Sequence, residues 1–151
     1  MSKIKIYAKS ILIPVIIGGI VGLFISSSID YSGLEKPFLS PPSIAFPIVW
    51  TILYILMGIS YGILESKKLN DSNIKLIYNI QLFVNAMWSI FFFTLKWRFF
   101  AFIWILILDI LVIRMIIEFY KKNKLSGLLQ IPYLLWILFA SYLNIAIYLI
   151  N

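Results

Sequence analysis

The sequence contains no cysteine and no histidine. Without cysteine the chain can form no disulfide, and without either residue it lacks the usual protein ligands of zinc. It also lacks the histidine or cysteine that most often holds haem iron axially. Nucleophilic catalysis by a Ser–His or Cys–His pair is excluded for the same reason. We therefore expect no metal site and no resident cofactor.

Charge is also scarce. Only 13% of the 151 residues are charged, 62% are hydrophobic, and the mean hydropathy is +1.00. A soluble domain has about a quarter of its residues charged, so this chain has too little polar surface to cover a soluble globule. The composition indicates an integral membrane protein in a lipid bilayer. The net charge of +7 would suggest nucleic acid in a soluble protein. Here the basic residues lie between apolar runs, so we expect no nucleic-acid partner.

Long apolar runs are what the sequence has in abundance. Each is about 20 residues long, the length that a helix needs to cross a bilayer. The connections are short, which makes neighbouring helices antiparallel. We predict an all-α, five-transmembrane-helix bundle and a single domain, 1–151, because no repeat or boundary is evident. The first run follows three lysines, but its length favours a retained helix over a signal peptide. The predicted helices are 10–29, 44–64, 76–95, 99–117 and 125–150.

The basic residues predict the orientation of the bundle. They are concentrated before the first helix, after the second and after the fourth, whereas the opposite side has few. By the positive-inside rule the N-terminus is cytoplasmic, and the C-terminus and the Pro-rich loop 33–43 are outside. Abundant Ile, Lys and Asn suggest an AT-rich bacterial genome, so we expect a bacterial plasma membrane. The basic residues of the cytoplasmic side are Lys3, Lys5, Lys9, Lys67, Lys68, Lys75, Arg114, Lys121, Lys122 and Lys124; those of the opposite side are Lys36, Lys96 and Arg98.

Aromatic residues recur along one face of the second predicted helix. Phe46, Trp50, Tyr54, Met57 and Tyr61 are separated by steps of three or four residues, which places them on one helix face. Such a face either looks into the bundle or lies in the aromatic belt at the membrane surface. Periodicity alone leaves both interpretations open.

Polar residues are rare within the third and fourth predicted helices. Gln81 and Asn85 share a face with Trp88, and amides in hydrocarbon are costly unless they are hydrogen-bonded. Interhelical hydrogen bonding explains Gln81 best, whereas Asn85 fits either such bonding or a pocket wall. Asp109 is a candidate proton relay, although a bond to a neighbouring helix is the interpretation we favour.

The fifth predicted helix again combines aromatic and small residues on one face. Tyr133, Trp136, Ala140 and Asn144 share this face, and Pro132 is expected to kink the helix or open a turn. Together the three helices predict a cavity with aromatic walls and few amides that opens toward the Pro-rich loop. Such a cavity suits a flat, largely apolar ligand.

Two pairs of glycines are spaced four residues apart. Gly18 and Gly22 form one pair, and Gly58 and Gly62 form the other. This spacing predicts close helix packing within the fold, with a dimer seam as the alternative.

The motifs, taken in order, resemble the TspO/MBR family, the tryptophan-rich sensory proteins and mitochondrial translocator protein. The resemblance covers nearly the whole chain. The first motif is K-P-x-x-x-P-P followed by F-x-x-x-W-x-x-L-Y-x-x-M-G. It is carried by Lys36, Pro37, Pro41, Pro42, Phe46, Trp50, Leu53, Tyr54, Met57 and Gly58. The later motifs are carried by Asn85 and Trp88, by Trp97, Arg98, Phe100 and Ala101, and by Pro132, Tyr133, Trp136, Phe139, Ala140, Leu143 and Asn144.

This resemblance implies a homodimer that binds porphyrins such as protoporphyrin IX, and benzodiazepine- or isoquinoline-type ligands, in an intramembrane pocket capped by the first loop. It implies a receptor or sensor role; the alternative is a transporter of porphyrins or other hydrophobic small molecules. Some bacterial members degrade protoporphyrin in light and oxygen. If this chain does so, the resemblance assigns the reactivity to Trp50 and Trp136. The ligand-binding residues it implies are Pro41, Pro42, Phe46, Trp50, Tyr54, Asn85, Trp88, Tyr133, Trp136 and Ala140.

The chain departs from the family pattern at two places. Many relatives have a tryptophan where this chain has Leu39, so the loop has one stacking group fewer. The sterol motif of the animal proteins needs a basic residue after a C-terminal tyrosine. Here Tyr148 is followed only by Leu149, Ile150 and Asn151, so cholesterol recognition through that motif is not expected.

Overall fold

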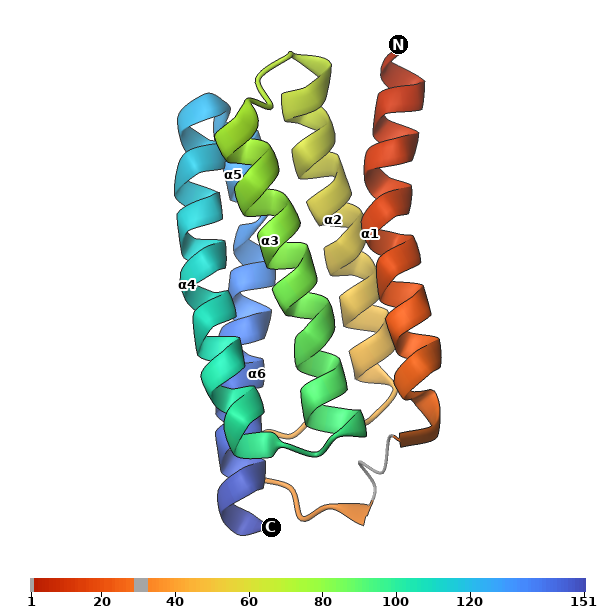
Figure 1. Ribbon diagram of the computed structural model, residues 1–151, viewed down its shortest axis with the longest axis vertical. Coiled ribbons are helices and arrows are strands. Elements are labelled where there is room, and N and C mark those ends of the chain that lie inside the picture. The colour runs from red at the N-terminus through yellow and green to blue at the C-terminus, as the bar shows by residue number, and fades with distance from the viewer. Residues whose placement is uncertain (1, 29–32) are drawn as a thin grey trace.

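The structure, a computed structural model, describes residues 2–28 and 33–151. Within these residues it consists of helices joined by short connections, with no strand (Figure 1). Five spans among them are long and apolar enough to cross a membrane: α1, α2, α3 with η3, α4, and α5 with α6. The predicted fold class, an all-α bundle of five membrane-spanning helices, is confirmed. The elements are α1 (Lys3–Ile25), η1 (Ser26–Ser28), α2 (Ala45–Ser66), α3 (Ser72–Ser89), the π-helical turn η3 (Ile90–Thr94), α4 (Arg98–Lys122), α5 (Lys124–Leu128) and α6 (Ile131–Ile150).

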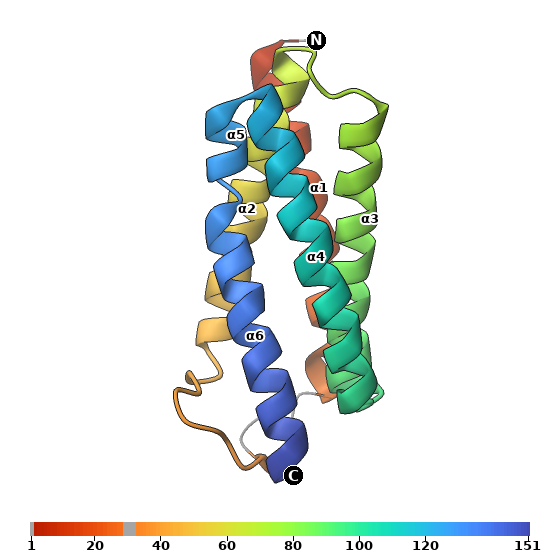
Figure 2. The ribbon, with the colours of Figure 1, turned by 90° about the vertical axis from the view of Figure 1, so that its left-hand side faces the viewer.

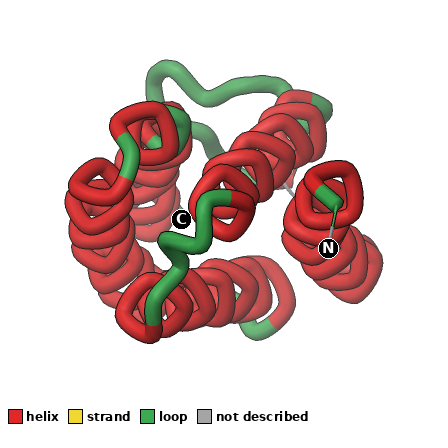
Figure 3. The backbone as a smooth tube through the Cα atoms, turned by 90° about the horizontal axis from the view of Figure 1, so that it is seen from above, coloured by secondary structure: helices red, strands yellow, loops and turns green. Residues whose placement is uncertain are grey.

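The spans run alternately up and down, and the two termini lie at opposite ends of the bundle (Figures 1 and 2). Helix α1 packs mainly against α2, whereas α4 packs against both α3 and α6. Seen from above, α1 stands at the side of the bundle rather than at its centre (Figure 3). The Pro-rich loop is at the end where α1 finishes and α2 begins, here called the loop end.

Several helices begin or end at other residues than the apolar runs predicted. Helix α1 starts at Lys3 rather than at residue 10, and its predicted end at Ile29 lies outside the described residues. Helix α3 starts at Ser72 rather than at residue 76, because the Asp71 carboxylate caps it by accepting a hydrogen bond from the Ile74 N–H at 3.0 Å. Helix α4 continues to Lys122, beyond the run that ends at residue 117. Caps and polar end turns set these boundaries, and hydropathy does not register them.

The last span is interrupted near its start. Helix α5 ends at Leu128, and α6 begins at Ile131 with Pro132 in its first turn. Proline lacks the N–H that would continue the helix from α5, so it fits the first turn of a new one. The predicted effect of Pro132 therefore takes the form of a break and not of a kink.

The Gly58–Gly62 pair lets α1 and α2 approach closely. A Cβ atom at Gly58 would lie 2.5 Å from the Ile11 Cα and from the Ser10 carbonyl oxygen. One at Gly62 would lie 2.8 Å from the ring of Tyr7. This pair therefore packs helices within one chain, as its spacing predicts.

An ion pair joins the two helix ends opposite the loop end. Lys122 Nζ lies 2.7 Å from Asp71 Oδ2, so the end of α4 is tied to the N-cap of α3. The hydrogen bond from Lys122, assisted by the Ile74 N–H, lowers the pKa of Asp71. The charged form of this exposed carboxylate is therefore favoured by folding.

This contact predicts an acid-dependent part of the stability. A carboxyl group whose folded-state pKa is lowered stabilises the fold above its unfolded pKa of about 3.9, and this contribution is lost as the pH falls through the folded-state value. We expect the melting temperature in detergent to fall more steeply on acidification in the native chain than in an Asp71→Asn variant. The Glu118→Gln variant removes the surface pair with Lys121 and serves as the control. Identical acid profiles for native protein and Asp71→Asn would contradict the assignment.

Candidate functional site

A cavity of about 470 Å³ lies between α1, α2 and α3 at the loop end of the bundle. Aromatic residues of α2 and α3 form much of its wall, and α1 closes it with small and aliphatic residues. From α1 it is lined by Val15, Gly18, Gly19, Val21, Gly22, Leu23 and Ile25. From α2 and the residues before it come Ser43, Phe46, Pro47, Trp50, Thr51 and Tyr54; from α3 and η3 come Trp88, Ser89 and Phe93.

The aromatic stripe of α2 points into the bundle. Trp50 stacks on Tyr54 with ring centroids 5.6 Å apart and planes 27° apart, and both rings line the cavity. Further along the stripe, Met57 is fully buried, and Tyr61 stacks on Tyr78 at 4.5 Å. Of the two interpretations of this face, the inward one holds, because its residues meet other helices.

Three hydrogen bonds connect α2, α3 and α6 behind this wall. The Tyr54 hydroxyl donates to Asn85 Oδ1 at 2.7 Å, and Asn85 Nδ2 donates to the Tyr133 hydroxyl at 2.8 Å. The Tyr133 hydroxyl in turn donates to Gln81 Oε1 at 2.8 Å. Asn85 and Tyr133 thus hold the ring of Tyr54 in place from behind, and neither lines the cavity itself. The chain of bonds satisfies amides that would be costly in hydrocarbon.

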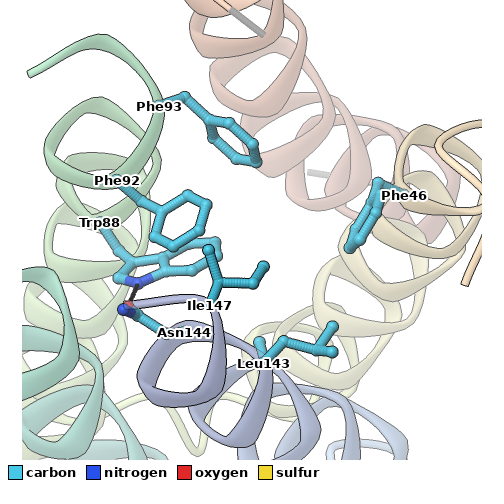
Figure 4. A pocket seen from close by; sticks show the side chains of 8 residues that line it. Phe46, Trp88, Phe92, Phe93, Leu143, Asn144 and Ile147 are labelled. Carbon is cyan, nitrogen blue, oxygen red and sulfur yellow. Dashed lines mark hydrogen bonds between the residues drawn. The ribbon is translucent and has the colours of Figure 1, made fainter. Parts of the chain in front are cut away.

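A second, much smaller cavity of about 20 Å³ lies beside the first, next to α6. Figure 4 shows Phe46 of α2 facing Phe92 and Phe93 of η3 across it, above residues of α6. Its wall includes Ala140 and Asn144. Phe46 and Phe93 line both cavities and so stand between them.

Trp88 also lines both cavities, and its position is fixed by a hydrogen bond. Its indole Nε1 donates to Asn144 Oδ1 at 3.0 Å, as drawn in Figure 4, and Asn144 Nδ2 donates to the Arg98 carbonyl at 2.7 Å. Trp88 stacks on Phe92 with centroids 5.4 Å apart. The predicted pocket-wall residue Ala140 belongs to the small cavity only.

Trp136 lines neither cavity. Its ring meets Phe46 edge to face with centroids 5.9 Å apart. Its buried indole Nε1 has no hydrogen-bond partner among the described residues. The two tryptophans that the family resemblance treats alike therefore have different surroundings, since Trp50 faces the large cavity and Trp136 lies behind Phe46.

Pro41 and Pro42 lie where the loop meets α2 and line neither cavity. The Pro42 carbonyl accepts a hydrogen bond from the Ala45 N–H at 3.0 Å, which starts the helix. The loop is fastened to α6: the Tyr142 hydroxyl donates to the Phe38 carbonyl at 2.6 Å. Asn151 also bonds the backbone of Glu35, at 3.2 and 3.0 Å.

The contribution of α1 to the site did not follow from the sequence. Gly18 packs against the ring of Tyr54, as its spacing predicts, but a Cβ at Gly19 or Gly22 would meet nothing within 4 Å. These two glycines therefore leave space instead of filling it. The glycines of α1 were the signal in the sequence that could have predicted a cavity wall. Their four-residue spacing, however, predicts only close helix packing.

Asp109 lies away from both cavities. Its Oδ2 accepts a hydrogen bond at 2.8 Å from the Ser141 hydroxyl, which joins α4 to α6. This contact agrees with the interhelical bond that we favoured over a proton relay.

The chain is similar in sequence to known proteins. A sequence profile described as the TspO/MBR family matches residues 10–149. The tryptophan-rich protein TspO of Archaeoglobus fulgidus is 45% identical over 154 aligned positions, which cover 100% of this chain and 99% of the relative. The tryptophan-rich protein TspO of Chlorobaculum tepidum is 37% identical, with 80% and 78% covered. The human translocator protein is 31% identical, with 78% and 72% covered.

Proposed function

This chain belongs to the TspO/MBR family of multi-pass membrane proteins, and on that premise we propose that it is a receptor-type protein that binds a porphyrin in the cavity between α1, α2 and α3. Protoporphyrin IX is the proposed ligand. Benzodiazepine- and isoquinoline-type compounds, which are also flat and aromatic, would occupy the same cavity. The proposal includes a homodimer in a bacterial plasma membrane, with the N-terminus cytoplasmic and the loop end outside.

The aromatic lining of the large cavity is the observation that carries this proposal. Trp50 and Tyr54 present a stacked pair on one side, and Trp88 and Phe93 come from the neighbouring helix. Flat conjugated ligands gain energy from such rings, by stacking or by edge-to-face contact. The volume of about 470 Å³ lies within the range of roughly 300–1,000 Å³ of ligand pockets.

The same geometry supports a photochemical extension of the binding role. Trp50 borders the proposed ligand directly and is the candidate first electron donor to a photoexcited ring. The donation would leave a tryptophan radical cation and a reduced ring, which passes the electron on to O2. Trp136 is separated from the large cavity by Phe46, so it would act as a secondary donor. If the tryptophans carry the reaction, a chain with both Trp50→Phe and Trp136→Phe loses light-dependent bleaching of the porphyrin. Undiminished bleaching by that double variant would rule out the radical role.

The test of the proposed function is a titration of detergent-purified protein with protoporphyrin IX. We expect saturable quenching of tryptophan fluorescence, because Trp50 and Trp88 line the cavity.

Illumination of the complex with and without oxygen then distinguishes the two roles. Bleaching of the porphyrin faster than that of free porphyrin indicates degradation, and binding without such bleaching indicates a receptor. A Gly19→Leu variant, which places a side chain into open space at the cavity wall, tests the location of the site and should bind weakly. Absence of saturable binding to the native chain would contradict the proposal.

A further inference from the structure

The first half of α1 is held firmly against α2. Gly58 brings the backbones together, with its ideal Cβ only 2.5 Å from the Ile11 Cα. The Ser10 hydroxyl donates to Glu65 Oε2 at 3.1 Å, and Lys9 Nζ lies 3.9 Å from Glu65 Oε1. Close packing and polar bonds thus act together on this half of the helix.

We call these contacts of Gly58 and Glu65 with α1 the clamp. Pro14 follows the clamp directly and divides α1 into two halves. Pro14 lies inside the helix, and its side chain is buried. A proline inside a helix removes the backbone bond to the carbonyl four residues earlier, here that of Ser10, and so creates a point at which a helix bends. All the residues of α1 that line the large cavity, from Val15 to Ile25, follow Pro14.

The second half of α1 lacks the polar bonds to α2 that hold the first half, although Ile25 near its end is buried. Both α1 and α3 lie wholly within the described residues, and no hydrogen bond or ion pair joins them. Gly19 and Gly22 have no neighbour within 4 Å of an ideal Cβ, although Gly18 does meet the ring of Tyr54. Leu23 lines the cavity and is nevertheless 79% exposed, so the cavity wall here reaches the surface that faces lipid.

At the loop end, by contrast, the Pro-rich loop is held by polar contacts. Hydrogen bonds from Tyr142 to the Phe38 carbonyl and between Asn151 and Glu35 fasten the loop to α6. Any opening that lifts the loop away from α6 breaks these bonds. A ligand dissolved in the bilayer that enters past α1 needs to break no polar contact between α1 and α3.

We propose that the half of α1 after Pro14 swings away from α3 and opens a lateral entrance, through which apolar aromatic ligands pass from the lipid into the cavity. The clamp at Gly58 and Glu65 is the fixed part and Pro14 is the hinge. The motion itself does not depend on which ligand binds; only its use rests on the proposed function.

Spin-label distances test the motion without any ligand. Because the chain has no cysteine, nitroxides can be attached to Leu23→Cys in α1 and to Leu95→Cys directly after η3, both exposed positions. The matched control pair joins the same two spans before the hinge, at Leu12→Cys and Phe83→Cys, which are also exposed. In bilayer nanodiscs we expect a broad or two-peaked distance distribution for 23/95 and a narrow one for 12/83. Distributions of equal width in the two pairs would overturn the proposal.

A Pro14→Ala variant tests the hinge and its use. Alanine restores the missing backbone bond, so the 23/95 distribution should narrow, and protoporphyrin IX in nanodiscs should bind and leave several-fold more slowly, with Kd unchanged. Unchanged distances and rates in a folded Pro14→Ala variant would overturn the hinge. If protoporphyrin IX fails to bind the native chain, the proposed function fails, while the spin-label distances still decide whether α1 opens. If Pro14→Ala does not fold, the comparison of the 23/95 and 12/83 pairs decides by itself.

Discussion

Replacing Gly58 with leucine is expected to separate α1 from α2 and to prevent the chain from forming a stable bundle. The first side-chain carbon would lie 2.5 Å from both the Ile11 Cα and the Ser10 carbonyl oxygen, and 2.9 Å from the Ile11 nitrogen. These are backbone atoms, which cannot turn aside as a flexible side chain can. Overpacking typically costs about 1–3 kcal/mol and occasionally more, and we expect a value at the upper end because a whole helix must move.

The measurement is the melting temperature and the monodispersity of the detergent-purified protein. Gly19→Leu is the matched control, because the same substitution there meets no atom within 4 Å of the new Cβ. That variant should stay folded, with its effect confined to ligand binding. Equal stability of the two variants would mean that α1 does not pack against Gly58 as described.

Replacing Trp50 with alanine is expected to weaken porphyrin binding far more than the same replacement of Trp136. Trp50 lines the large cavity and is stacked on Tyr54, whereas Trp136 lines neither cavity and lies against the edge of Phe46. Loss of one aromatic stacking partner costs about 1–3 kcal/mol, which corresponds to roughly 5- to 150-fold in Kd. For Trp136→Ala we expect only a few-fold change, transmitted through Phe46.

Fluorescence titration with protoporphyrin IX, using the remaining tryptophans, measures both variants against the native chain. Initial rates of bleaching under light and oxygen should follow the same order, with Trp50→Ala the slower. Equal losses of affinity would show that the bound ring reaches Trp136, which requires Phe46 to move and the two cavities to merge. In that case the ligand site extends to α6.

Hydropathy and charge determined the membrane class and the number of spans, because the bilayer admits helices only where about 20 apolar residues follow one another. The order of the aromatic, proline and asparagine motifs determined the family resemblance, and the profile match over residues 10–149 confirms it. The ends of the helices were predicted less well. Asp71 caps α3, which therefore starts earlier than the apolar run, and Pro132 interrupts the last span. A cap or a missing N–H group depends on a single residue, which the hydropathy of a long run does not register.

Only the tertiary structure decided which residues of a helix face border the cavity. Periodicity places Trp50 and Trp136 each on one face of a helix, but it does not predict what lies opposite that face. In the structure Trp50 lines the large cavity, whereas Trp136 lies against Phe46 and does not line it. Gly58 and Gly22 each lie four residues from a second glycine. A Cβ atom at Gly58 would meet the backbone of α1, whereas one at Gly22 would meet nothing within 4 Å. The reason is physical: the sequence pattern fixes the direction of a side chain around its own helix, whereas packing and cavities depend on where the neighbouring helices come to lie.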